Sequence, residues 1–159
     1  MNYKAGDRVV YPHHGAATIE KTETIELGGE PKEYFVLKTA HDELTVRVPV
    51  DKVDEVGMRR PISVEDVEDL YLLLAKKDVR EPANWSRRFK NHQEKLKSGD
   101  VYQVAEVVRN LALREKTKGL SAGEKTMYSK ARKVLVSELS FALDVSEDTA
   151  MDQVEEQLV

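Results

Sequence analysis

The sequence predicts an α+β protein of two domains, a small antiparallel β-barrel over residues 1–60 and an all-α helical bundle over residues 61–159. Two changes along the chain predict this division. Residues 6–49 hold short β-branched and aromatic runs between turn-forming residues, whereas later apolar residues recur at spacings of three and four. A glycine- and proline-containing stretch at residues 57–63 separates the two patterns and is typical of a domain boundary.

Four short runs are predicted to be strands. They lie at residues 8–11, 17–19, 34–37 and 44–48. Each is rich in Val, Ile, Thr or aromatic residues, which favour extended backbone. The intervening breakers, at Pro12 to Gly15, Gly28-Gly29 with Pro31, and His41 to Glu43, leave room only for hairpin-sized connections. A domain of this size and strand number suits an SH3-like or Tudor-like barrel better than a sandwich.

The first two helices are predicted from their capping residues. Ser63 lies three residues before Asp66 and is followed by apolar residues at Leu70 and Leu74, so it is expected to cap an amphipathic helix. Glu81-Pro82 is expected to mark the end of that helix. Asn84 is expected to cap the second helix.

The remaining helices follow similar signals. Residues 98–100 open a third helix, and Gly119 suits the position just after its end. Ser121 and Glu124 form a capping box for a fourth helix that continues through Leu139. The last residues, 144–159, form an acidic tail that is expected either to make one short helix or to fray.

Composition narrows the class of protein. The chain has 159 residues, of which 40% are hydrophobic, enough for a buried core in one or two small domains. It contains no cysteine, so neither a disulfide framework nor a thiolate metal site is expected, and the cytoplasm is the expected location. We see no signal-peptide pattern and no run of about 18 apolar residues that could span a membrane. No membrane partner is therefore expected.

Charge is distributed unevenly along the chain. The formal net charge is −4, yet residues 76–133 hold sixteen Lys and Arg against seven Asp and Glu, a local charge of +9. The rest of the chain carries nine basic and twenty-two acidic residues, a charge of −13. A basic segment of this size inside the predicted helical domain indicates contact with nucleic acid.

Groups that could catalyse a reaction or bind a metal do not form a recognisable site. The histidines, at positions 13, 14, 41 and 92, fall in different segments or on a turn and lack a ligand spacing. The sequence also lacks a Gly-rich phosphate loop, a nucleophile elbow and a zinc-protease motif. It therefore predicts neither an enzyme nor a bound cofactor.

The single tryptophan, Trp85, lies beside a basic cluster. The cluster consists of Arg87, Arg88 and Lys90. In a helix that begins at Asn84, Trp85 falls on the same face as Phe89 and Leu96, so it could extend a buried stripe. It could equally project from the first helical turn and insert its indole into a DNA groove while the basic side chains neutralise phosphates. The pattern alone leaves both interpretations open.

Two further basic residues are candidates for binding. Lys125 lies in the first turn of the helix that follows Ser121, where it could reach a phosphate together with the helix N-terminus. Arg47 lies in an alternating strand that Pro49 ends, which is typical of an edge strand. Such an edge can bind a partner protein by adding a strand, although Arg47 could also be an ordinary surface residue.

Motifs in both halves of the chain match one known family in order. They are Gly6-Asp7 and residues 9–17, 32–34, 44–49, 84–88, 98–101, 104–109 and 119–125. On these residues the chain closely resembles the actinobacterial CarD transcription regulators. The resemblance implies an N-terminal Tudor-like domain that docks on the β subunit of bacterial RNA polymerase, similar to the polymerase-interacting domain of the transcription-repair coupling factor. It also implies a C-terminal helical domain that contacts promoter DNA.

The resemblance assigns roles to individual residues. It implies polymerase contact by four consecutive residues, Leu44, Thr45, Val46 and Arg47. It implies that Trp85 enters the minor groove at the upstream edge of the melted promoter as a wedge, while neighbouring basic side chains hold the backbone. The implied function is stabilisation of the open promoter complex. Ile25 departs from the family pattern, because close relatives tend to have an arginine there.

Three functions are compatible with these observations. The leading one is a global regulator that works as a monomer on polymerase, associated with the nucleoid through it, and binds promoter DNA largely without sequence specificity. The second is a stand-alone DNA-binding architectural protein, which the +9 segment favours. The third is a protein-interaction adaptor in which Trp85 is a core residue.

Overall fold

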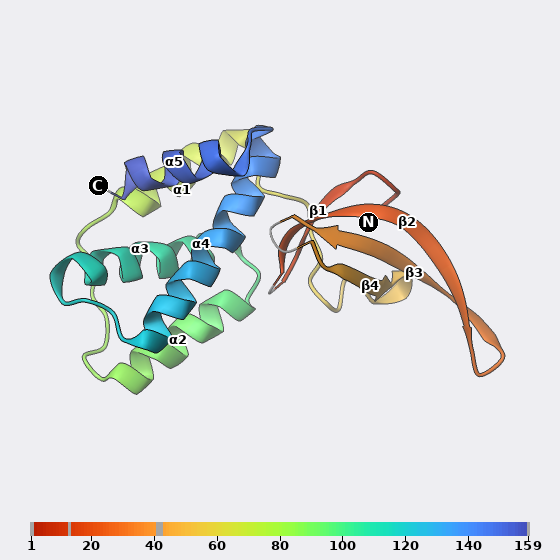
Figure 1. Cartoon of the computed structure of the whole chain (residues 1–159), viewed down its shortest axis with the longest axis horizontal. Helices are drawn as coiled ribbons and strands as arrows, with labels where there is room; N and C mark the ends of the chain where they lie inside the picture. The colour runs from red at the N-terminus through yellow and green to blue at the C-terminus, as the bar shows by residue number, and fades with distance from the viewer. Residues whose placement is uncertain (1, 13, 41–42, 159) are drawn as a thin grey trace.

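The computed structural model describes residues 2–12, 14–40 and 43–158. Within them a β-sheet lies at one end of the molecule and the helices at the other (Figure 1). The strands are β1 (Arg8–Tyr11), β2 (Gly15–Leu27), β3 (Glu30–Thr39) and β4 (Thr45–Pro49), followed by a 3-10 turn at Val50–Lys52. The helices are α1 (Val64–Ala75), α2 (Trp85–Lys97), α3 (Val101–Thr117), α4 (Ala122–Leu143) and α5 (Glu147–Gln157). The predicted fold class is confirmed.

The sheet is an antiparallel meander with strand order β1-β2-β3-β4. Its register shifts between Ile19 and Lys21, and a bulge of this kind bends the strand and increases its twist. The concave face buries Val9, Ile19 and Leu37 completely. The sheet therefore curls into a half-barrel, and β4 is left as an edge strand.

The hairpin of β2 and β3 is longer than the sequence predicts. Its outer part pairs Thr24 with Glu33 and Ile25 with Lys32, and Gly28 and Gly29 close it with φ values of 64° and 87°. This arm protrudes beyond the other two strands (Figure 1). Threonine and glutamate alternate along it without a buried face, so hydrophobic periodicity could not reveal it.

Helix α1 ends earlier than predicted. Its last buried residue is Leu74, and the helix stops at Ala75, not at Glu81-Pro82. Lys76 is already extended, with ψ 128°, and Lys77 and Asp78 after it are exposed, so no buried face continues the helix. Ser63 occupies the predicted N-cap position, but its side chain makes no capping hydrogen bond. The segment from residue 76 to residue 84 is therefore an extended connection beside the helices.

The other predicted helix ends are confirmed. Asn84 Oδ1 accepts from the Arg87 N–H at 3.0 Å, and Asp100 Oδ1 accepts from the Tyr102 N–H at 3.0 Å. Gly119 follows α3 with a φ of 79°, and Ser121 forms the predicted capping box at the start of α4. The acidic tail forms α5, because Ala150 and Val154 bury one face of it.

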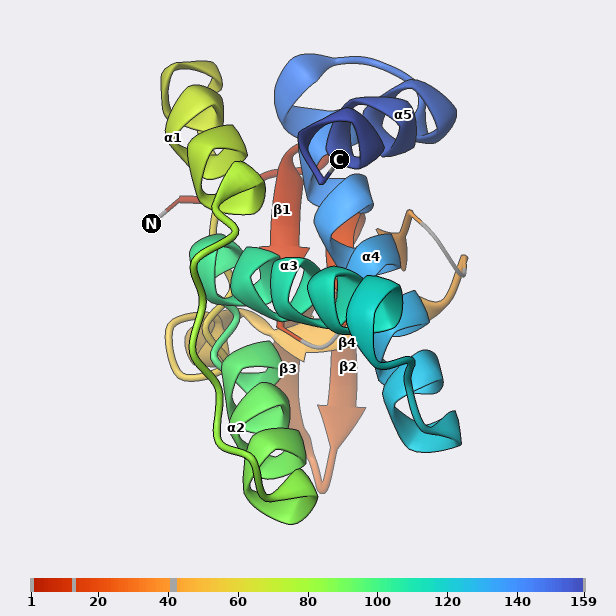
Figure 2. The same cartoon turned by 90° about the vertical axis from the view of Figure 1, so that its left-hand side faces the viewer.

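Helix α3 is the centre of the helical domain. It lies across the middle of the group, with α1 and α5 above it and α2 below (Figure 2). Its residues Ala105, Val108 and Leu111 are fully buried, together with Leu135 and Leu139 of α4.

No helix in the described residues is both long and apolar enough to cross a membrane.

The sheet and the helices meet along the start of β2 and the C-terminal half of α4. The Ala16 N–H donates to Ser137 Oγ at 3.0 Å, and a Cβ at Gly15 would lie only 2.7 Å from that oxygen. Glycine is therefore required at position 15 for this close approach.

Arg59 fixes the connection between the β-sheet and the helices. Its backbone pairs with Val10 of β1, and its guanidinium donates to both carboxylate oxygens of Glu138 on α4 at 2.7 Å. Glu138, only 2% exposed, also accepts from the Ile62 N–H at 2.8 Å. Because one residue bonds both to the sheet and to α4, the two parts are held in a fixed relative position.

Candidate nucleic-acid and polymerase interfaces

Trp85 is a partly exposed residue whose ring is held in place. It is the first residue of α2 and is 44% exposed. One face of its indole stacks on Phe89, with ring centroids 4.8 Å apart and planes 17° apart. Its Nε1 donates to Ser121 Oγ at 3.2 Å and to Glu124 Oε1 at 3.3 Å. The indole is thus neither buried in the core nor free to rotate.

Glu124 is the buried acceptor that organises this site. Its Oε1 accepts from the Ser121 N–H and Oγ as well as from Trp85, and its Oε2 accepts from Arg88 Nε at 3.4 Å. Arg114 Nε lies 3.8 Å from the same Oε2. Burial alone would raise the pKa of Glu124, but hydrogen bonds from Ser121 and the charge of Arg88 more than offset it and lower the pKa. The carboxylate is therefore ionised at neutral pH.

Arg88 does not lie at the surface, in contrast to its predicted role at a phosphate. Its side chain is 2% exposed, and its Nη1 donates to the carbonyls of Pro82 and Ala83 at 3.3 Å each. Position 88 faces α4, where Glu124 supplies the opposite charge. Arg88 therefore holds the start of α2 against α4 and the 76–84 connection, and does not present its charge to a ligand.

The other predicted DNA-binding side chains, Arg87, Lys90 and Lys125, are exposed. Arg87 and Lys90 lie on the solvent side of α2, and Lys125 lies in the first turn of α4. The two helix starts are adjacent, because a Cβ at Gly123 would be 3.8 Å from Trp85 Cζ2. The first turns of α2 and α4 thus lie side by side at the exposed Trp85 ring, and their free backbone N–H groups are suited to bind a phosphate.

The predicted polymerase-binding residues lie at the edge strand. Leu44 is 47% exposed just before β4, and Thr45 and Arg47 are exposed on it, while Val46 is half-buried. Strand β4 pairs only with β3 among the described strands. Arg47 Nε lies 3.5 Å from Glu23 Oε2. The edge is therefore open to a partner, and Glu23 orients its arginine.

Ile25 lies on the protruding hairpin arm. It pairs with Lys32, whereas β4 pairs with β3 only from Tyr34 to Lys38. Ile25 is thus outside the part of the sheet that β4 covers.

Several residues of these sites could not be identified from the sequence as functional. Glu124 is visible there only as a capping acid, and its bonds to α2 come from residues 36 and 39 positions earlier. Glu23 and Glu138 carry no motif, because each partner is distant in the chain. Burial of the capping-box acid Glu124 would have indicated its role, but the spacing of residues along a helix does not show whether a capping acid is buried.

The histidines do not form a metal site in the part of the chain that the structure describes. His92 is buried with its Nε2 2.7 Å from Glu81 Oε2, and the His14 ring lies beside Tyr11 at 5.4 Å. His13 and His41 lie outside the described residues. No group of three His, Cys, Asp or Glu residues could hold a metal ion among those described.

Glu124→Gln should destabilise the protein in a pH-dependent way. Because folding lowers the pKa of Glu124, its ionised form stabilises the fold above the ordinary glutamate pKa of about 4.3, and this contribution is lost as the pH falls through the lower folded value. At pH 7 the variant should melt roughly 5 °C or more below the parent, since it leaves the buried Arg88 unpaired.

Thermal unfolding by circular dichroism across acidic and neutral pH measures this effect. The gap between parent and variant should narrow progressively as the pH falls below the ordinary glutamate pKa of about 4.3. Glu115→Gln, at an exposed position of α3, is the matched control and should leave the melting temperature unchanged. A gap of the same size at acidic and neutral pH would contradict the assignment.

Comparison with known proteins identifies the family. The description "CarD-like/TRCF RID domain" matches residues 3–62, and "CarD, C-terminal domain" matches residues 69–155. The chain is also 31% identical over 145 residues to the candidate transcription factor YdeB of Bacillus subtilis (strain 168), an overlap of 91% of this chain and 95% of YdeB. The resemblance that the motifs indicate is confirmed. The chain belongs to the CarD family of transcription factors and carries the RNA polymerase-interacting domain of that family in its N-terminal half.

Proposed function

We propose that this protein docks on the β subunit of RNA polymerase through the edge strand β4 and stabilises the open promoter complex with Trp85. The observation that carries the proposal is the indole itself: the only tryptophan is exposed and fixed by Phe89, Ser121 and Glu124. A fixed apolar ring on a basic helical segment can enter a minor groove at a distorted base step without first losing side-chain freedom.

The wedge acts by shifting the population of promoter states. An aromatic ring stacked on an exposed base contributes roughly 1–3 kcal/mol, and it does so only where the DNA is opened or kinked. If the protein binds the open complex about 1.4 kcal/mol more tightly than the closed complex, the open fraction rises about tenfold relative to the closed one. Such contacts follow DNA shape, so little sequence specificity is expected.

Docking explains how an acidic protein can act on DNA. The net charge of −4 disfavours tight independent binding to DNA, although the helical segment is basic. Tethering to polymerase raises the local concentration of the helical domain at the bubble edge, so weak DNA affinity suffices. The protein acts as a monomer in this account, since each copy carries both surfaces.

Arg47→Glu should weaken polymerase binding by more than tenfold. The substitution reverses the charge on the exposed edge and places a second carboxylate beside Glu23, and a misplaced charge in an interface costs several kcal/mol. Lys4→Glu makes the same charge reversal at an exposed position outside β4 and should have little effect. Binding to the polymerase β subunit measured by biolayer interferometry tests this, and equal affinity for parent and Arg47→Glu would remove Arg47 from the interface.

Open-complex lifetime with and without the protein tests the proposed function. Purified polymerase on a promoter fragment should show a longer lifetime when the protein is present. Band-shift assays on the same fragment separate the stand-alone alternative, which the +9 segment favours. Tight binding of DNA in the absence of polymerase, with no change in open-complex lifetime, would support an architectural protein instead.

A further inference from the structure

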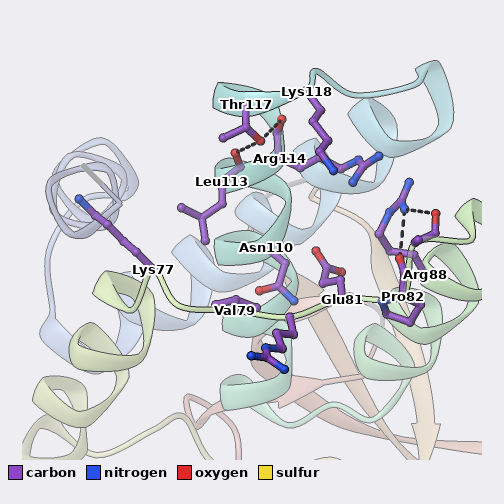
Figure 3. A pocket seen from close by; sticks show the side chains of 12 residues that line it. Lys77, Val79, Glu81, Pro82, Arg88, Asn110, Leu113, Arg114, Thr117 and Lys118 are labelled. Carbon is purple, nitrogen blue, oxygen red and sulfur yellow. Dashed lines mark hydrogen bonds between the residues drawn. The ribbon is translucent and has the colours of Figure 1, made fainter.

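The 76–84 connection between α1 and α2 buries none of its own side chains. Toward α3 it borders a groove of about 580 Å³ that is open to solvent (Figure 3). A segment with few buried contacts opens easily unless polar contacts hold it. The connection ends at Asn84, directly before Trp85, so a movement of the connection would reach the indole.

Helix α2 is oriented in large part by polar side chains. Its two buried residues are Arg88, which is 2% exposed, and His92, which is 1% exposed. They lie four positions apart and therefore on the same face of the helix. A buried polar group is costly unless it has a partner, and a hydrogen bond to that partner fixes a direction. The partners of Arg88 and His92 therefore help to set how α2 lies.

These two side chains hold three consecutive residues of the connection. His92 Nε2 lies 2.7 Å from Glu81 Oε2. Arg88 Nη1 donates to the carbonyls of Pro82 and Ala83 at 3.3 Å each. Figure 3 shows Arg88 bonded to the connection beside Glu81. The chain just before α2 is thus attached to that helix at two points.

Glu81 is the one polar partner of the buried His92 ring among the described residues. The imidazole Nδ1 is shielded from solvent and has no hydrogen-bond partner in that part of the chain. Burial raises the pKa of Glu81, but the hydrogen bond and charge of His92 and the charges of Arg88 and Lys95 lower it on balance, so the carboxylate is ionised at neutral pH. Without Glu81 the ring would stay buried with no partner, which is costly.

The same network reaches the indole. Arg88 Nε donates to Glu124 Oε2 at 3.4 Å, and Glu124 Oε1 accepts from Trp85 Nε1 at 3.3 Å. We propose that Glu81 and His92 are positioning residues for Trp85, an inference that rests on the proposed function. Their pair holds the connection against α2, where its carbonyls orient Arg88, and Arg88 in turn keeps Glu124 in place to accept from the indole.

His92→Leu tests this pair on the full chain. Leucine fills the buried space but cannot donate to Glu81, whereas His92→Gln places an N–H donor near the position of Nε2 and should behave as the parent. Glu106→Ala is the control, because it removes a different ion pair of α2, that of Lys95 Nζ with Glu106 Oε2 at 2.9 Å. Circular dichroism checks that each variant folds.

Time-resolved fluorescence anisotropy reports on Trp85 directly, since it is the only tryptophan of the chain. In the parent, His92→Gln and Glu106→Ala proteins the indole should rotate only with the whole molecule, whereas His92→Leu should add a fast local component. A parental decay for His92→Leu, or the same fast component in either of the other variants, would overturn the proposal. This measurement needs neither polymerase nor DNA.

Open-complex lifetime, with polymerase saturated by each protein, tests what the positioning achieves. His92→Leu should shorten the lifetime by about two- to tenfold, a range typical of a network residue that contacts no ligand, while the other two variants keep it. A parental lifetime for His92→Leu beside a shortened one for Trp85→Ala would overturn the proposal. Parental lifetimes for both, with a fast component in His92→Leu, would contradict the proposed function and leave the positioning of the indole standing.

Glu81→Ala tests the same pair from the connection and replaces His92→Leu should that variant not fold. It should give the same fast component and the same shortened lifetime. The double variant Glu81→Ala/His92→Leu should be no worse than either single variant, because each substitution removes the same interaction. Additive losses in the double variant would show two independent effects and would overturn the proposal.

Discussion

Arg59→Ala should abolish most of the effect on the open complex while leaving polymerase binding intact. The guanidinium holds both oxygens of Glu138 at 2.7 Å, and Arg59 also pairs with Val10 at the edge of the sheet. Removing it leaves a buried carboxylate without its cation, which typically costs about 3–5 kcal/mol. The interface between the sheet and the helices should loosen. Trp85 would then no longer be held at a fixed offset, that is, a fixed position relative to the docking edge strand β4.

Arg60→Ala is the matched control for this prediction. Arg60 is the next residue, but its guanidinium is half-exposed, lies 3.5 Å from Asp7 and stacks over Tyr3 at 5.1 Å, contacts that are each expected to contribute about 1 kcal/mol or less. Polymerase affinity, melting temperature and open-complex lifetime would be measured on both variants. An Arg59→Ala protein that docks normally and gives the parental lifetime would show that the fixed offset is unnecessary.

A double variant separates lost geometry from the cost of a buried charge. Arg59→Leu/Glu138→Leu removes both charges, and such replacements of a buried ion pair are often neutral for stability. Its melting temperature should recover most of the loss. If the lifetime also recovers, then packing of the two parts is enough to set the offset; if it does not, the hydrogen bonds of Glu138 to Arg59 and Ile62 are required.

The fold was predictable where local signals and core packing agree. The helix starts at Asn84, Asp100 and Ser121 were predicted correctly, because each capping side chain bonds within three residues of itself. The end of α1 was not, because it depends on where packing stops after Leu74 and not on the nearest proline. Only the apolar parts of the strands were visible, so the polar hairpin arm was missed.

The position of the candidate site could be predicted from the sequence, but the contacts that hold Trp85 in place could not. Trp85 and its basic neighbours stand out in the sequence, yet burial and exposure were equally compatible with their spacing. The deciding contacts come from Ser121 and Glu124, which lie 36 and 39 residues away. The sequence predicts Arg88 at the surface for the same reason: its partner on α4, Glu124, is distant in the chain and cannot be inferred from the neighbouring residues.

Trp85→Ala should shorten the open-complex lifetime by about fivefold or more, given roughly 1–3 kcal/mol for a stacked ring. The residue is 44% exposed and lies outside the helical core, so the variant should still fold with a lowered melting temperature, because it loses the stacking on Phe89 and the bonds to Ser121 and Glu124. Strand β4 is untouched, so docking should persist. Trp85→Phe keeps a ring but loses the bonds to Ser121 and Glu124, and it should give an intermediate lifetime. Leu72→Ala, at a 71% exposed position in the same domain, is the control and should match the parent.

The most direct test of the account is therefore the competitor-challenged lifetime of the open complex, measured with polymerase saturated by either parent or Trp85→Ala protein. Saturation keeps docking equal, so any difference reports the contact of the indole with DNA. The account predicts a long lifetime with the parent and a lifetime close to that of polymerase alone with Trp85→Ala. Equal lifetimes with the two proteins would contradict it.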